Sequence, residues 1–172
     1  MSDQCQGSIT LYGVFPAEHL DELIQQIEDD GLGDDYGSDA LQDTIEIRAY
    51  IEQCAANPKN KGLFLCGTSG SGEFDLFEKC VEWGVNFSAH YESGYEWMAG
   101  RRRVHDGVET SCLADNDGNP VAALWELRKF HEHGMIQALM DMLSFAGEHD
   151  LPPFEIQGRL ARAAATVAEG KS

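Results

Sequence analysis

The chain has 172 residues, 42% of them hydrophobic, and a net charge of −18. This length and composition are typical of a single globular domain with a substantial core. No hydrophobic run approaches the roughly 20 residues that span a membrane, and the N-terminus lacks the basic and apolar regions of a secretory signal. We therefore expect one cytoplasmic domain over residues 1–172 that does not bind membranes.

The negative charge is concentrated at the start of the chain. Residues 1–60 contain 13 acidic and two basic residues, whereas residues 61–172 contain 17 acidic and ten basic residues. Duplex nucleic acid carries dense negative charge and should repel such a protein. The composition predicts either a partner with a basic surface or a charge that only maintains solubility.

The first third of the chain predicts a strand and two helices joined by an acidic loop. Residues 8–12 alternate in hydrophobicity as a strand does, and residues 17–30 carry hydrophobic side chains on one helical face. Residues 40–56 form the second expected helix, with Ser38 or Asp39 as its cap. Its hydrophobic face is supplied mostly by Leu41, Ile45, Ile47, Ile51 and Cys54.

The central segment, residues 61–97, indicates a strand, a glycine-rich turn, a helix and another strand. These elements are expected at residues 62–66, 67–72, 73–83 and 85–91. Phe74, Phe77 and Val81 form the hydrophobic stripe of the helix. We predict that seven hydrophobic residues are largely buried: Leu63, Phe64, Leu65, Phe77, Val81, Phe87 and Leu139.

The second half of the chain predicts several hairpin strands followed by helices. The expected strands are 95–98, 101–104, 108–114, 121–122 and 154–156, and the expected helices end near 133 and cover 135–145 and 160–168. This order predicts an α+β fold, with a mainly antiparallel sheet of four to five strands and helices packed on one face. Residues 157–172 are expected to be a loosely packed tail.

The glycine-rich turn at residues 67–72 resembles a phosphate-binding loop only in part. The Walker pattern requires a lysine and a hydroxyl residue after its second glycine, but Glu73 and Phe74 stand there. A glutamate at that place repels phosphate. The turn is therefore expected to connect a strand to a helix and to bind no nucleotide.

The cysteines and histidines form no recognisable site. The five cysteines are odd in number and never form a C-x-x-C pair, which favours isolated, reduced and mostly buried thiols. One alternative is an enzyme in which Cys66 is the nucleophile and His90 or His105 its base. No local signature supports it, so we predict no catalytic residue, no metal site and no cofactor.

The only basic run, Arg101-Arg102-Arg103, lies close to the aromatic residue Trp97. Arginines beside aromatic side chains can bind single-stranded nucleic acid, but the surrounding charge is strongly negative. The arginines could instead pair with acids inside the protein, or form a second surface, together with Trp97, that pairs with the acidic region of another copy in a homo-oligomer.

The acidic segment from Glu28 to Asp39 contains six acids and no base, and its spacing does not fit a calcium-binding loop. We expect an exposed surface that binds a basic partner protein. Small acidic proteins without a catalytic signature resemble, in style rather than in motif, accessory or anti-defence proteins of phages and plasmids that mimic nucleic acid. The residues expected to bind the partner are Glu28, Asp29, Asp30, Asp34, Asp35 and Asp39.

Overall fold

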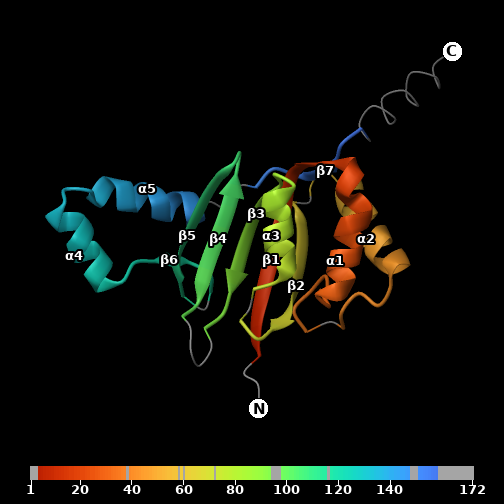
Figure 1. Cartoon of the computed structure of the whole chain (residues 1–172), viewed down its shortest axis with the longest axis horizontal. Helices are drawn as coiled ribbons and strands as arrows, with labels where there is room; N and C mark the ends of the chain where they lie inside the picture. The colour runs from red at the N-terminus through yellow and green to blue at the C-terminus, as the bar shows by residue number, and fades with distance from the viewer. Residues whose placement is uncertain are drawn as a thin grey trace.

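The computed structural model describes residues 4–37, 39–57, 59, 61–71, 73–93, 98–115, 117–147 and 151–158. Within these residues, seven strands and five α-helices form an α+β fold, which confirms the expected class (Figure 1). The strands are β1 (Cys5–Phe15), β2 (Leu63–Ser69), β3 (Asn86–Tyr91), β4 (Gly100–His105), β5 (Val108–Ala114), β6 (Pro120–Val121) and β7 (Phe154–Ile156). The helices are α1 (Leu20–Asp29), which follows a 3-10 turn at Ala17–His19, α2 (Thr44–Ala56), α3 (Asp75–Glu82), α4 (Leu124–Glu132) and α5 (Ile136–Gly147).

The sheet is mainly antiparallel, as expected, with the strand order β2-β1-β3-β4-β5-β6. It has seven strands rather than four to five, because the two short segments β6 and β7 also pair with it. β7 is the exception in direction, since it runs parallel to the end of β1.

The two faces of the sheet follow from the alternation of side chains along β1. Ile9 and Leu11 are fully buried on one face, and their partners on β2 and β3, such as Leu65 and Phe87, share it. Tyr12 points to the opposite face, as an even-numbered residue of the same strand must. The first face is therefore hydrophobic, and the second is more polar.

Helices α1, α2 and α3 cover the hydrophobic face and form the core with it. Each helix buries one stripe of side chains at helical spacing. The buried residues are Leu23, Ile24 and Ile27 on α1, Ile47, Ile51 and Cys54 on α2, and Leu76, Phe77 and Cys80 on α3.

Two residues expected in this core lie elsewhere. Val81 is 38% exposed, because the buried face of α3 is centred on Leu76, Phe77 and Cys80, and Val81 lies beyond its edge. Phe64 is only half-buried, because it points to the polar face of β2 while its neighbours Leu63 and Leu65 point to the core. The other expected core residues, among them Phe87 and Leu139, are buried.

Helix α2 begins later than the sequence suggested. Asp43 is its N-cap, and its Oδ1 accepts hydrogen bonds from the backbone N–H groups of Ile45 and Glu46 at 2.9 and 2.8 Å. Ile45 therefore lies in the first turn and is 77% exposed, rather than on the buried face. Asp39 does not cap the helix, and Ser38 lies outside the described residues.

Strand β2 is longer than expected and includes the first part of the glycine-rich segment. It continues to Ser69 because β1 continues to Cys5 and pairs with it there. The expected strand at residues 95–98 and the expected helix at 160–168 lie wholly or largely outside the described residues, as does most of the tail.

Helices occupy both faces of the sheet rather than one. Helix α5 packs on β4, β5 and β6 from the polar face, opposite α1 to α3. Together α4 and α5, residues 124–147, extend away from the sheet beyond β6 (Figure 1). We call these two helices the helical arm. Across the described ranges, no helix has the length and hydrophobicity that crossing a bilayer requires.

Replacement of Phe77 by alanine should lower the free energy of unfolding by about 3–5 kcal/mol, because the ring is 1% exposed and contacts Phe74 and Phe87. Val81→Ala on the same helix should cost less than about 1 kcal/mol, because Val81 is 38% exposed and lies beyond the edge of the buried face. Denaturant titration of both variants measures the difference, and equal losses would contradict the position assigned to α3.

Candidate binding surfaces

Five exposed acids form one surface at the end of α1 and in the loop that follows it. Their position depends on a short bridge between this loop and the edge of β2, in which the Gly33 N–H donates to the Cys66 carbonyl at 2.7 Å and the Cys66 N–H donates back at 3.0 Å. We call these five residues the acidic patch: Glu28, Asp29, Asp34, Asp35 and Asp39.

Two members of the acidic patch lie where a helix disfavours them. Glu28 and Asp29 occupy the last turn of α1, which contains no basic residue. The carboxyl end of a helix carries partial negative charge, so each acid there costs roughly 0.3–1 kcal/mol at low salt. Gln25 Nε2 donates to Asp29 at 2.9 Å, which holds the carboxylate without neutralising it.

Asp30, the sixth acid predicted to bind a partner, points inward instead. Its Oδ2 accepts a hydrogen bond from the backbone N–H of Leu76 at 3.0 Å, at the start of α3. Burial raises the pKa of Asp30, while the hydrogen bond from Leu76 opposes that rise. Asp30 therefore connects α1 to α3 and is not counted in the acidic patch.

A concave region lies beside the acidic patch, with a volume of about 330 Å³. Asp35 and Asp39 line it together with Tyr36, whose side chain is 47% exposed, and with Cys66. The Tyr36 ring meets the Phe64 ring edge-on at 5.5 Å between centroids. Two carboxylates and an aromatic face in one hollow suit a cationic side chain better than an anion.

The three consecutive arginines of β4 point alternately to the two faces of the sheet and are used inside the fold. Arg102 lies on the hydrophobic face, where it donates to Glu78 of α3 and Glu109 of β5, both at 2.7 Å. Arg101 lies on the polar face and donates to the Gly118 carbonyl at 2.8 Å. Both side chains therefore fasten neighbouring segments to β4.

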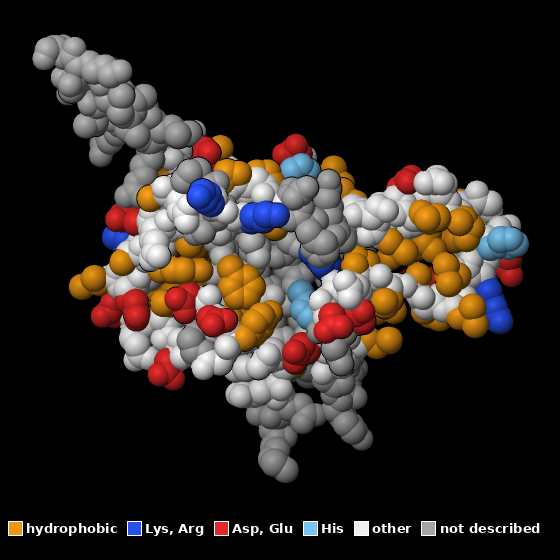
Figure 2. Space-filling model, turned by 180° about the vertical axis from the view of Figure 1, so that it is seen from behind, with side chains coloured by type: hydrophobic (Ala, Val, Ile, Leu, Met, Phe, Trp, Pro, Cys, Tyr) orange, Lys and Arg blue, Asp and Glu red, His pale blue; other side chains and the backbone are white. Residues whose placement is uncertain are grey.

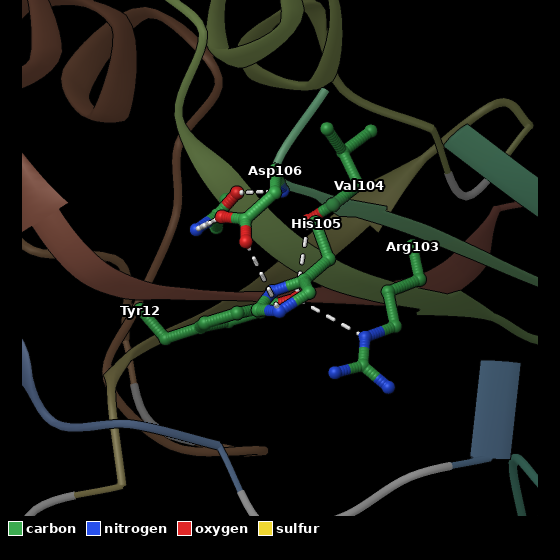
Figure 3. A network of polar contacts seen from close by, with 6 residues as sticks. Tyr12, Arg103, Val104, His105 and Asp106 are labelled. Carbon is green, nitrogen blue, oxygen red and sulfur yellow. Dashed lines mark hydrogen bonds and ion pairs between the residues drawn. The ribbon is translucent and has the colours of Figure 1, made fainter. Parts of the chain in front are cut away.

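Arg103 is 2% exposed and holds α5 against the polar face. Its Nη1 donates to the Phe145 carbonyl at 2.5 Å, close to the carboxyl end of α5, where a cation is favoured. Its Nε donates to the Tyr12 hydroxyl at 3.1 Å, and the Tyr12 ring stacks on His105 (Figure 3). The structure thus gives Arg103 an internal role, while Trp97, also predicted for the second surface, lies outside the described residues.

Cys66, His90 and His105 do not form a nucleophile and base pair. Cys66 and His90 both pair with Ser8, from opposite sides of β1, so two strand spacings, roughly 10 Å, separate them. His105 lies one strand further away. Burial first, and then the nearby carboxylates of Asp35 and Asp34, raise the pKa of Cys66 to about 11, so the thiol is protonated at neutral pH.

Metal and phosphate sites also find no geometric support. Within the described ranges, no group of three or more His, Cys, Asp or Glu side chains could hold a metal ion. At the start of α3, where a phosphate could have accepted hydrogen bonds, the Asp30 carboxylate already accepts the Leu76 N–H. A comparison with protein-family models, curated proteins and solved structures finds no match.

The sequence interpretation missed the exposed hydrophobic surface of the helical arm, which lies on the right in Figure 2. Leu124 and Trp125 are 63% and 65% exposed, and α4 has no buried residue. Helical periodicity identified α4 and α5 but could not show whether another element covers them. The exposed hydrophobic residues of the arm are Leu124, Trp125, Leu127, Met135 and Met140.

The raised pKa of Asp30 predicts a specific pH dependence. The folded state binds this proton more tightly than the unfolded chain does, so ionisation of Asp30 lowers stability as the pH rises above about 3.8. Asp30→Asn keeps an acceptor for the Leu76 N–H and removes the titration. Relative to Asp30→Asn, the wild-type protein should therefore lose unfolding free energy as pH rises through this window. Denaturant titrations measure the unfolding free energy of the wild type minus that of Asp30→Asn, and a difference that stays constant or increases with pH would contradict the buried position of Asp30.

The Tyr12 hydroxyl should matter for stability because it both accepts from Arg103 and donates to the Val104 carbonyl at 3.1 Å. Tyr12→Phe leaves both of these buried groups without that partner and should cost about 1–3 kcal/mol. Tyr36→Phe removes a hydroxyl from a half-exposed ring and should cost less. Thermal and denaturant unfolding of the two variants compare the losses, and a smaller loss for Tyr12→Phe would argue against the network.

Proposed function

We propose that this chain is an acidic interaction protein that binds a basic surface of a partner protein through the acidic patch. The observation that carries the proposal is the exposure of Glu28 and Asp29 at the carboxyl end of α1, where the helix dipole opposes them. Gln25 hydrogen-bonds both carboxylates but leaves their charge in place. Residues that oppose local stability are expected at functional sites.

The distribution of positive charge supports the same role. The arginines of β4 donate to acceptors inside the fold, and Arg48 pairs with Asp21 at 2.6 Å. These four arginines are therefore engaged outside the acidic patch. Acidic side chains gather on the half of the molecule away from the helical arm, as Figure 2 shows. A field of this sign should accelerate association with a basic surface and should weaken with salt.

The hollow beside the patch suggests the partner chemistry. A guanidinium group can bind bidentately to a carboxylate and stack on an aromatic ring, which a compact ammonium does less well. Asp35, Asp39 and the exposed ring of Tyr36 supply both kinds of contact. The proposed partner therefore presents arginine side chains.

Mimicry of nucleic acid is a narrower form of this proposal. An accessory or anti-defence protein of a phage or plasmid that acts in this way would occupy the basic surface of a DNA-binding protein. Duplex DNA and this chain would then compete for the same partner surface. A partner of another kind would bind this chain but would not bind DNA.

The binding prediction compares two variants with the same change in net charge. The patch variant carries Asp29→Asn, Asp34→Asn, Asp35→Asn and Asp39→Asn, and the control carries Glu18→Gln, Glu22→Gln, Glu73→Gln and Asp117→Asn at exposed positions spread over the surface. A fluorescent oligoarginine peptide is titrated into each at low salt and at about 0.15 M salt. The patch variant should bind about tenfold more weakly than the control, since four exposed charge pairs are lost.

The two outcomes separate a binding surface from general acidity. Equal weakening in both variants would mean that only net charge matters, and the proposal would fail. As an internal check on folding, neutralisation of Asp29 should leave stability unchanged or raise it by a few tenths of a kcal/mol, because it removes an unfavourable interaction with the helix dipole.

A further inference from the structure

The helical arm is poorly supported by its own chain. Helix α4 has nine residues and buries none of them, although isolated helices of this length are unstable in water. Within the described residues, its supports are the packing of half-buried Phe130, the bond from the Ala123 N–H to Glu126 at 3.0 Å, and its contacts with α5. Its exposed leucines and tryptophan are of the kind that concentrate at protein interfaces.

The distribution of charge limits what can cover this surface. The arm, residues 124–147, contains three acids and two bases, and thus carries −1 of the total charge of −18. The remainder carries −17, so the net charges of two bodies repel each other, whereas the arms carry almost no net charge. The arm also projects away from the sheet, which keeps the two charged bodies apart (Figure 1).

The surface of the arm is also self-complementary in charge. A groove of about 280 Å³ between α4 and α5 is lined by Leu127 and Ile136, and also by Arg128, His131 and Glu132. Among the contacts of the described residues, neither Arg128 nor Glu132 takes part in an ion pair. If Arg128 of one copy meets Glu132 of a second copy across a two-fold axis, the symmetry also brings Glu132 of the first copy to Arg128 of the second, so the contact is isologous.

We propose that the helical arm is a self-association surface, in which the arms of two copies pack antiparallel about a two-fold axis. Leu124 and Trp125 form the hydrophobic centre, because they flank Arg128 and Glu132 on one side of α4. Arg128 of each copy pairs with Glu132 of the other. The bodies, with their acidic patches, remain apart and accessible. The inference is independent of what the acidic patch binds.

Sedimentation equilibrium of the full chain over a micromolar concentration series tests the contact directly. The wild-type chain should dimerise, and dimerisation should strengthen as salt rises, because salt screens the repulsion between two bodies of −17 each more than it weakens the two Arg128–Glu132 pairs. An arm that docked instead on the acidic patch of another copy would show the opposite salt dependence and would form open chains. A monomer at every concentration and salt, or weakening with salt, overturns the proposal.

Substitutions then locate the contact. Leu124→Ser with Trp125→Ser should lower the association constant by about 30-fold or more, as expected for a central hydrophobic anchor. The matched control, Val14→Ser with Val108→Ser, also removes two exposed hydrophobic side chains, but from the sheet, and should leave association unchanged. Equal effects of the two pairs would show that the arm is not the interface.

A charge exchange tests the two-fold pairing itself. Arg128→Glu and Glu132→Arg should each weaken dimerisation by about tenfold, because like charges then face each other across the axis. The double variant restores opposite charges and should recover most of the wild-type association. Failure of the double variant to recover, with circular dichroism unchanged, contradicts the antiparallel arrangement.

Discussion

The alternation of three arginines along β4 is the constraint on which the rest of the structure depends. Arg102 fastens α3 and β5 on the hydrophobic face, while Arg101 and Arg103 fasten the Gly118 loop and α5 on the polar face. A single antiparallel strand thus connects both helical layers to the sheet. Because Arg103 is buried among Tyr12 and Phe145, loss of its partners leaves a charge that water cannot easily reach.

This internal use of arginine shapes the outer surface. The three arginines of β4 contact groups inside the fold, so they do not offset the exposed carboxylates at the end of α1. These acids lie at the carboxyl end of α1 although the helix dipole opposes them. Different residues therefore contribute to stability and to surface charge. The β4 arginines hold neighbouring segments together, and the residues of the acidic patch take no part in those contacts.

Much of the fold could be predicted from hydrophobic period, because alternation fixes strands and a period of 3.6 fixes helices. The hydrophobic period does not reveal where a helix begins or where the covering sheet ends. Val81 and Ile45 were therefore expected in the core, but both are exposed. The acidic patch followed from composition, but six equivalent acids in a sequence cannot show that Asp30 turns inward to Leu76. The exposure of the arm depends on which other described segments pack against it, and no local sequence pattern records that.

The central claim is that the acidic patch is the surface that meets a basic partner. Backbone amide chemical shifts in an NMR titration with an oligoarginine peptide test it most directly, because they report location without mutation. The account predicts that the largest changes lie between residues 28 and 39 and around Cys66, and that they disappear with salt. Changes centred on α4 and α5, or spread evenly over all acidic regions, would contradict it.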